Sequence, residues 1–279
     1  MPVSLIAVDV DGTLLNSDGK ITEGTQAAFR AAAEHGIRLA LGTGRCRDEC
    51  RYILRQLPEL HYMINCSGAT VYDVTEDREL YVEGLPMDTV RDLYRRLGDL
   101  DCLFEVMADG FIYTDRARLS HLDEYLNHYY IDIIRSTRTP TDMEELLRTR
   151  TEPVAKLHLF FRCEADQQLA RSRLAPAGLP MLSSIPENLE LNLPTVDKGL
   201  GLRRLAEYLG IPTSDCMAIG DNLNDVGMLR EAGYPVLVAN GNPDILPFVK
   251  YVTASCDEDG VALAIRSVLD GTLERLRKE

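Results

Sequence analysis

Two aspartates, Asp9 and Asp11, follow an apolar run in the stretch IAVDVDGTLL at residues 6–15. The run is typical of a strand that is buried on both faces. Residues two apart on an extended chain point to the same side, and Gly12 then allows a sharp turn. Two carboxylates this close repel each other unless a cation lies between them. A hard divalent cation with oxygen ligands fits, and Mg²⁺ needs only one or two protein carboxylates.

Three more polar clusters stand where strands are expected to end or a helix to begin. GTGR at 42–45 ends a second apolar run, GDNLND at 220–225 follows the strand-like CMAI, and VDKG at 196–199 opens a helical pattern. Open parallel sheets bind ligands beyond the carboxyl ends of their strands. We therefore expect the clusters to converge on one site, where Asp221 and Asp225 add two further carboxylates.

The elements that must position these residues form an α/β pattern. Strand-like and helix-like segments alternate up to about residue 70 and again after about residue 190, which favours a parallel sheet covered by helices. Between them the pattern mixes strands and helices as in an α+β unit. The chain of 279 residues is also longer than one compact core usually holds. We expect a discontinuous core at 1–83 and 188–279, with an inserted unit at 84–187.

The motifs DVDGTLL, TGR, VDKG and GDNLND occur in the order and spacing of the haloacid dehalogenase (HAD) superfamily. The chain resembles its Cof-type branch, subclass IIB, over roughly 3–83 and 188–272. The resemblance implies a Rossmann-like core with an α/β cap, and a phosphoric monoester hydrolase that works through an aspartyl-phosphate. Its catalytic residues would be the nucleophile Asp9, the general acid and base Asp11, and the phosphoryl-binding residues Thr43 and Lys198.

The resemblance also implies a metal site and a substrate site. Mg²⁺ would be held by the carboxylate of Asp9, the backbone carbonyl of Asp11 and Asp221, with Asn224 and Asp225 as supports. Substrate contacts are expected from turns of the core and from the stretch SSIPENLELN, at Gly44, Arg45, Ser67, Gly68, Ser183, Glu187 and Asn192. Arg45 could instead face the cap.

One departure from the family pattern concerns the end of the third strand. The family usually has NGA where this chain has SGA, with Ser67 in the place of the asparagine. Asn65 stands two residues earlier and faces the same side on a strand. The departure changes no catalytic assignment.

Composition limits the partners. The net charge of −14 disfavours nucleic acid and anionic membranes, which are themselves polyanions. Seven cysteines without a CxxC pair favour reduced thiols in a cytoplasmic protein. We see no signal peptide and no apolar stretch long enough to span a bilayer. The expected partner is a small phosphorylated metabolite, and the expected assembly is a monomer or a weak homodimer.

These observations predict a Mg²⁺-dependent phosphatase of small phosphorylated metabolites, with sugar phosphates first among them. One alternative is a phosphomutase like the phosphomannomutases, which resemble this architecture. Another is a non-catalytic regulator that binds phosphorylated metabolites. Such regulators often lack a catalytic residue, whereas this chain has the whole set.

Overall fold

The computed structural model describes residues 3–125, 135–183 and 186–278, and the chain divides into two compact units. Unit 1 comprises the chain up to Arg45, Cys50–Val82 and the chain from Val196 on. Unit 2 comprises Cys46–Glu49 and Glu83–Thr195. Within the described ranges, no helix combines the length and the apolar character needed to cross a bilayer.

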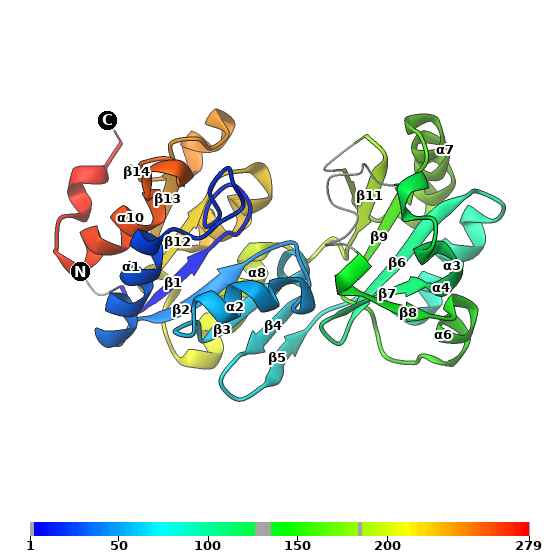
Figure 1. Ribbon diagram of the computed structural model, residues 1–279, viewed down its shortest axis with the longest axis horizontal. Coiled ribbons are helices and arrows are strands. Elements are labelled where there is room, and N and C mark those ends of the chain that lie inside the picture. Colours follow the sequence, from blue (N-terminus) through cyan, green and yellow to red (C-terminus); the bar gives the residue numbers. More distant parts are fainter. Residues whose placement is uncertain (1–2, 126–134, 184–185, 279) are drawn as a thin grey trace. The chain divides into compact units, whose positions relative to one another are not determined.

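Unit 1 is built on one twisted sheet (Figure 1). Its described strands are β1 Leu5–Val8, β2 Arg38–Gly42, β3 Tyr62–Asn65, β4 Thr70–Asp73, β5 Arg78–Val82, β12 Cys216–Gly220, β13 Tyr234–Val238 and β14 Tyr251–Thr253. They are ordered β14-β13-β12-β1-β2-β3-β4-β5. The strands from β14 to β3 are parallel, and β4 and β5 extend the sheet as an antiparallel pair.

Helices cover both faces of this sheet. They are α1 Glu23–Glu34, α2 Arg51–Gln56, α8 Lys198–Leu209, α9 Val226–Glu231 and α10 Gly260–Leu269. One apolar cluster joins Phe29 of α1 and Ile265 of α10 to the strands, and a second joins Leu205 of α8 and Leu229 of α9 to them. Every residue of β1 is buried, because it packs against both layers. The predicted fold class, a parallel-sheet α/β core with an inserted α+β unit, is confirmed.

Unit 2 contains a second, mostly antiparallel sheet. Its described strands are β6 Cys102–Ala108, β7 Phe111–Asp115, β8 Arg138–Thr141, β9 Lys156–Phe161, β10 Met181–Leu182 and β11 Asn188–Leu191. They are ordered β10-β11-β9-β6-β7-β8. The accompanying helices are α3 Met87–Leu97, α4 Arg116–Leu119, α6 Met143–Thr149 and α7 Glu164–Leu174. Helices α3, α6 and α7 contribute to one apolar cluster with alternate strand residues such as Phe104 and Leu159.

The unit boundaries differ from the expected ones at two places. Unit 2 extends to Thr195 instead of residue 187, because β11 pairs with β9 and so belongs to the inserted sheet. The short segment Cys46–Glu49 also belongs to unit 2, although the sequence placed it in the core. The first boundary, between Val82 and Glu83, lies one residue from the expected position.

Candidate active site

The predicted clusters meet at one edge of the sheet of unit 1. β12, β1 and β2 are parallel neighbours, so their carboxyl ends lie side by side. Asp9 directly follows β1, Thr43 follows β2 and Asp221 follows β12. Lys198 is the first residue of α8. This arrangement brings together residues that are far apart in the sequence.

Lys198 lies at the centre of the site, fully buried between two carboxylates. Its Nζ donates to Oδ1 of Asp9 at 2.5 Å and to Oδ1 of Asp225 at 2.6 Å. Burial alone would lower the pKa of Lys198, but the charges of Asp9 and Asp225 outweigh it and hold the pKa above its usual value. Asp197 caps the helix by accepting a hydrogen bond from the amide of Leu200 at 2.7 Å. Lys198 lies at the N-terminus of α8, where the helix dipole disfavours a cation, and the two carboxylates compensate for this.

Asp9, Asp221 and Asp225 form a cluster whose carboxylate oxygens lie within 4.8 Å of one another. Burial raises the pKa of Asp9 well above its usual value, although Lys198 opposes this shift. Burial, together with the charge of Asp225, also raises the pKa of Asp221. A bound divalent cation would relieve both effects by favouring the charged carboxylates, and all donors are hard oxygens. The residues therefore fit the expected Mg²⁺.

Asp225 supports this cluster through backbone contacts. Its Oδ2 accepts hydrogen bonds from the amides of Asp221 at 2.9 Å and Asn222 at 3.0 Å, while Oδ1 binds Lys198. Both oxygens are therefore engaged by the protein, which suits the expected supporting role. Asn224, the other expected support, is exposed.

The turn after Asp9 is packed tightly against Asp221. Gly12 has a φ of +79°, and a Cβ there would lie 2.7 Å from Oδ2 of Asp221. Thr13 donates from Oγ1 to Oδ1 of Asp221 at 3.1 Å, and Asn240 donates from Nδ2 to the carbonyl of Gly12 at 2.8 Å. A glycine at this position thus permits both the backbone conformation and the close approach.

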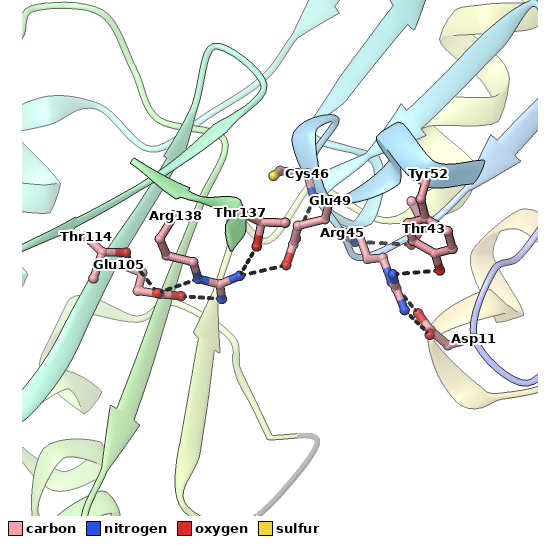
Figure 2. A network of polar contacts seen from close by, with 10 residues as sticks. All are labelled: Asp11, Thr43, Arg45, Cys46, Glu49, Tyr52, Glu105, Thr114, Thr137 and Arg138. Atoms are coloured by element: carbon pink, nitrogen blue, oxygen red, sulfur yellow. Dashed lines mark hydrogen bonds and ion pairs between the residues drawn. The ribbon is translucent and has the colours of Figure 1, made fainter. Parts of the chain in front are cut away.

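Asp11 lies in different surroundings from Asp9. Its side chain is 61% exposed and forms a two-point ion pair with Arg45 (Figure 2). Arg45 donates from Nε to Oδ2 at 3.0 Å and from Nη2 to Oδ1 at 2.6 Å. Its third nitrogen, Nη1, donates to the hydroxyl of Tyr52 at 3.2 Å. The guanidinium thus holds Asp11 with two of its five N–H donors, and its contact with substrate stays a prediction.

The loops after β2 and β3 hold each other. Ser67 donates its amide to the carbonyl of Thr43 at 3.0 Å, and Thr43 accepts at Oγ1 from the amide of Arg45 at 3.1 Å. Asn65 donates from Nδ2 to the carbonyl of Arg45 at 3.3 Å. Gly68 has a φ of +101°, and a Cβ there would lie 1.9 Å from the carbonyl oxygen of Asp197. The buried amide of Asn65 therefore supports the Thr43 loop, and Gly44 lies half-buried within that loop.

The three residues expected to contact substrate from unit 2 have contacts within that unit. Ser183 donates from Oγ to the carbonyl of Asn188 at 2.8 Å, and the buried Asn192 donates from Nδ2 to the carbonyl of Ala155 at 3.2 Å. Glu187 accepts the amide of Phe161 at its own carbonyl. These bonds give Ser183 and Asn192 a structural role. Two residues of the nominated stretch, 184–185, lie outside the described residues.

Sequence reasoning missed four side chains that organise the site. Asn222 and Asp225 form a capping box, and the spacing of asparagine and aspartate in GDNLND was a usable signal for it. Thr13 reaches Asp221, which is 208 residues away in the sequence. Asn240 carries no local signal, because its partner Gly12 is 228 residues away, and Tyr52, only 7 residues from Arg45, stands in no recognised motif.

Comparison with known proteins decides the family. The haloacid dehalogenase-like hydrolase family matches residues 6–265. The chain belongs to this family. It is 30% identical to the phosphatase YwpJ of Bacillus subtilis, over 96% of this chain and 100% of that protein. It is 26% identical to 5-amino-6-(5-phospho-D-ribitylamino)uracil phosphatase YcsE of the same organism, over 95% of each chain.

Solved structures agree with this assignment. A haloacid dehalogenase-like hydrolase from Bacteroides thetaiotaomicron has 27% sequence identity and a TM-score of 0.82, over 95% of this chain and 98% of that one. The subclass IIB sugar phosphatase BT4131 shares the fold with a TM-score of 0.75 at 20% identity, over 95% of this chain and 98% of that one. The predicted superfamily and phosphatase class are thereby confirmed.

Proposed function

We propose that this protein is a Mg²⁺-dependent phosphatase that hydrolyses small phosphorylated metabolites, sugar phosphates first among them, through a phosphate ester of Asp9. One observation carries the proposal: buried Lys198 binds Oδ1 of Asp9 and Oδ1 of Asp225. The lysine fixes the orientation of the Asp9 carboxylate and places a positive charge beside it. An anionic nucleophile that attacks an anionic phosphate needs such a charge.

In the first step, we assign the attack on phosphorus to Oδ2 of Asp9, since Oδ1 is held by Lys198. A bond forms between this oxygen and phosphorus while the ester bond to the leaving alcohol breaks. Asp11 donates a proton to the leaving oxygen. Thr43, buried at the end of β2, stands beside the transferring phosphoryl group.

In the second step, water attacks phosphorus, the bond to Asp9 breaks, and Asp11 takes the proton from the water. The carboxylate of Asp9 and the protonated Asp11 are thus regenerated. The ion pair with Arg45 suits Asp11 as a base in this step. Proton donation in the first step requires Asp11 to release one of its two hydrogen bonds with Arg45, so that one oxygen carries the proton while the other still accepts from Arg45.

The metal would be held by the carboxylate of Asp9, the backbone carbonyl of Asp11 and Asp221, with Asp225 fixing the loop that carries Asp221. When bound, Mg²⁺ supplies positive charge that offsets the repulsion between carboxylates and phosphate. Lys198 holds the Asp9 carboxylate through its hydrogen bond to Oδ1.

The substrate class, the role of unit 2 and the cellular location complete the proposal. The names of similar proteins point to small phosphate esters: one acts on a phosphorylated ribityl compound, and another is a sugar phosphatase. Unit 2 is inserted in the chain where a cap would choose the substrate and exclude water. The seven cysteines, which include no CxxC pair, fit the reducing cytoplasm.

A panel of phosphorylated metabolites, assayed for phosphate release with Mg²⁺ and with a chelator, tests the proposal. Metal-dependent release from a set of sugar phosphates is the expected result. Release that is unaffected by the chelator would overturn the Mg²⁺ requirement. Isomerisation of a hexose phosphate without phosphate release would replace the proposal with the phosphomutase, and binding without either reaction would favour the regulator.

A further inference from the structure

The four residues after Arg45 are held by unit 2. Within this segment, Cys46–Glu49, Asp48 donates its amide to the carbonyl of Gly110 at 2.9 Å. Arg47 donates from Nη2 to the carbonyl of Asp109 at 3.2 Å, and its guanidinium lies over the ring of Phe111. These contacts attach the segment to the turn between β6 and β7.

A buried ion network fixes the end of the same segment (Figure 2). Arg138 donates from Nε and Nη2 to the two oxygens of Glu105, at 2.8 and 2.9 Å, and from Nη1 to Oε1 of Glu49 at 2.9 Å. Glu105 is fully buried and also accepts a hydrogen bond from Thr114. Burial alone would lower the pKa of Arg138, but the charges of Glu105 and Glu49 hold it above its usual value. Breaking such a network leaves an uncompensated buried charge.

The other oxygen of Glu49 connects this network to the backbone. Its Oε2 accepts a hydrogen bond from the amide of Cys46 at 3.0 Å. This amide belongs to the peptide group whose carbonyl is that of Arg45. The carbonyl in turn accepts hydrogen bonds from the amide of Cys66 at 3.0 Å and from Nδ2 of Asn65 at 3.3 Å, both in unit 1. Because a peptide group is planar and rigid, its N–H and C=O directions are set together.

The orientation of this peptide group bears on Asp11. Its plane fixes the ψ angle of Arg45, and the side chain of Arg45 holds Asp11 through two hydrogen bonds. Loss of the hydrogen bond between the Cys46 amide and Glu49 therefore changes the direction from which Arg45 reaches Asp11. An error of about 1 Å in the position of a catalytic group can cost on the order of a hundredfold in rate.

We propose that Glu49 and Arg138 are positioning residues for Asp11, and that they act through the Arg45–Cys46 peptide group and the Arg45 side chain. Neither residue needs to touch the substrate for this role. The proposal rests on the proposed function of Asp11 as general acid and base. The buried ion network of unit 2 is then needed for catalysis as well as for stability.

The test compares two leaving groups in Glu49→Ala, Glu49→Gln and the wild type. Glu49 is only partly buried, and its removal leaves the Arg138–Glu105 pair intact. An alkoxide needs a proton to leave, whereas p-nitrophenolate leaves without one. We expect Glu49→Ala to lower kcat/KM about tenfold for the sugar phosphate that the wild type hydrolyses fastest, since general acid catalysis contributes roughly 10²- to 10⁴-fold. With p-nitrophenyl phosphate the loss should be clearly smaller.

Two controls separate positioning from a loss of structure. Glu49→Gln keeps an oxygen that can accept the Cys46 amide, so it should restore part of the lost rate. Arg173→Gln removes contacts with Leu97 and Asp99 inside unit 2, away from the Cys46–Glu49 segment, and should leave the ratio of the two substrates unchanged. Equal losses on both substrates in Glu49→Ala, or no loss at all, would overturn the proposal.

Amide hydrogen exchange gives a readout that does not depend on turnover. In Glu49→Ala, peptides that cover residues 43–52 should exchange faster, while peptides from α7 stay unchanged. Unchanged exchange at 43–52 would also overturn the proposal. If the wild type released no phosphate from any substrate, the proposed function would fail instead, and the exchange result would still decide whether Glu49 holds the peptide group.

Discussion

The ammonium of Lys198 binds Oδ1 of Asp9 at 2.5 Å, and both side chains are buried. This contact joins the start of α8 to the end of β1, which are 189 residues apart in the sequence. The lysine also binds Asp225, so one cation compensates two carboxylates in a site shielded from solvent. Under the proposed function, stability and catalysis therefore depend on the same side chain.

Replacing Lys198 by Met should lower both the free energy of unfolding and the rate of turnover. The change leaves Asp9 and Asp225 buried without their cation, which costs roughly 3–5 kcal/mol of unfolding free energy. Turnover should fall by at least about a hundredfold, because the charge beside the nucleophile is lost. Urea denaturation and phosphate release measure the two effects. The double variant Lys198→Met with Asp225→Asn should recover part of the stability and none of the activity; a recovery of activity would contradict the role of Lys198.

Replacing Gly12 by Ala should damage the site more than a matched change at Gly19. Both glycines have positive φ, +79° and +70°, so an alanine costs each about 1–2 kcal/mol in backbone strain. A Cβ at Gly12 would also meet Oδ2 of Asp221, whereas nothing lies within 4 Å of one at Gly19. We expect Gly12→Ala to raise the Mg²⁺ concentration needed for half-maximal activity. Gly19→Ala should leave it unchanged, and an equal shift in both would refute the close-approach argument.

His158 should make unit 2 less stable in acid. Burial lowers the pKa of His158 in the folded protein, and Nε2 lies 2.9 Å from Nδ2 of Asn188, which suits a neutral imidazole. The unfolded chain therefore binds a proton more readily, so stability falls as the pH drops below the usual histidine value of about 6.5. In urea denaturation between pH 7.5 and 5.5, His158→Gln should lose less stability than the wild type. His35→Gln, at an exposed position, should behave like the wild type.

The sequence predicted the parts of the site that follow from topology. Asp9, Thr43 and Asp221 each end an apolar strand, and parallel neighbours must place such ends together. Lys198 stands out only through its motif, since a lysine at a helix start is otherwise an ordinary surface residue. Its burial between Asp9 and Asp225 became visible only in the structure.

What the sequence did not predict depends on side-chain direction and on distant pairing. Strand β1 ends at Val8, before both aspartates, so the alternation expected of a strand does not hold for them: Asp9 binds Lys198 and Asp11 pairs with Arg45. β11 was missed because NLEL is short and partly polar; its pairing with β9 places it in the inserted sheet. Pairing between distant segments leaves no local signal.

The most direct measurement is the identity of the residue that carries phosphate during turnover. The protein is mixed with substrate and Mg²⁺, quenched in acid and reduced with borohydride, which converts an aspartyl-phosphate to homoserine. Mass spectrometry of the peptide that contains both Asp9 and Asp11 then locates the change. We expect homoserine at position 9, an unchanged Asp11, and no product in Asp9→Asn. Normal turnover with Asp9 unmodified, or near-normal activity of Asp9→Asn, would contradict the role of Asp9 as nucleophile.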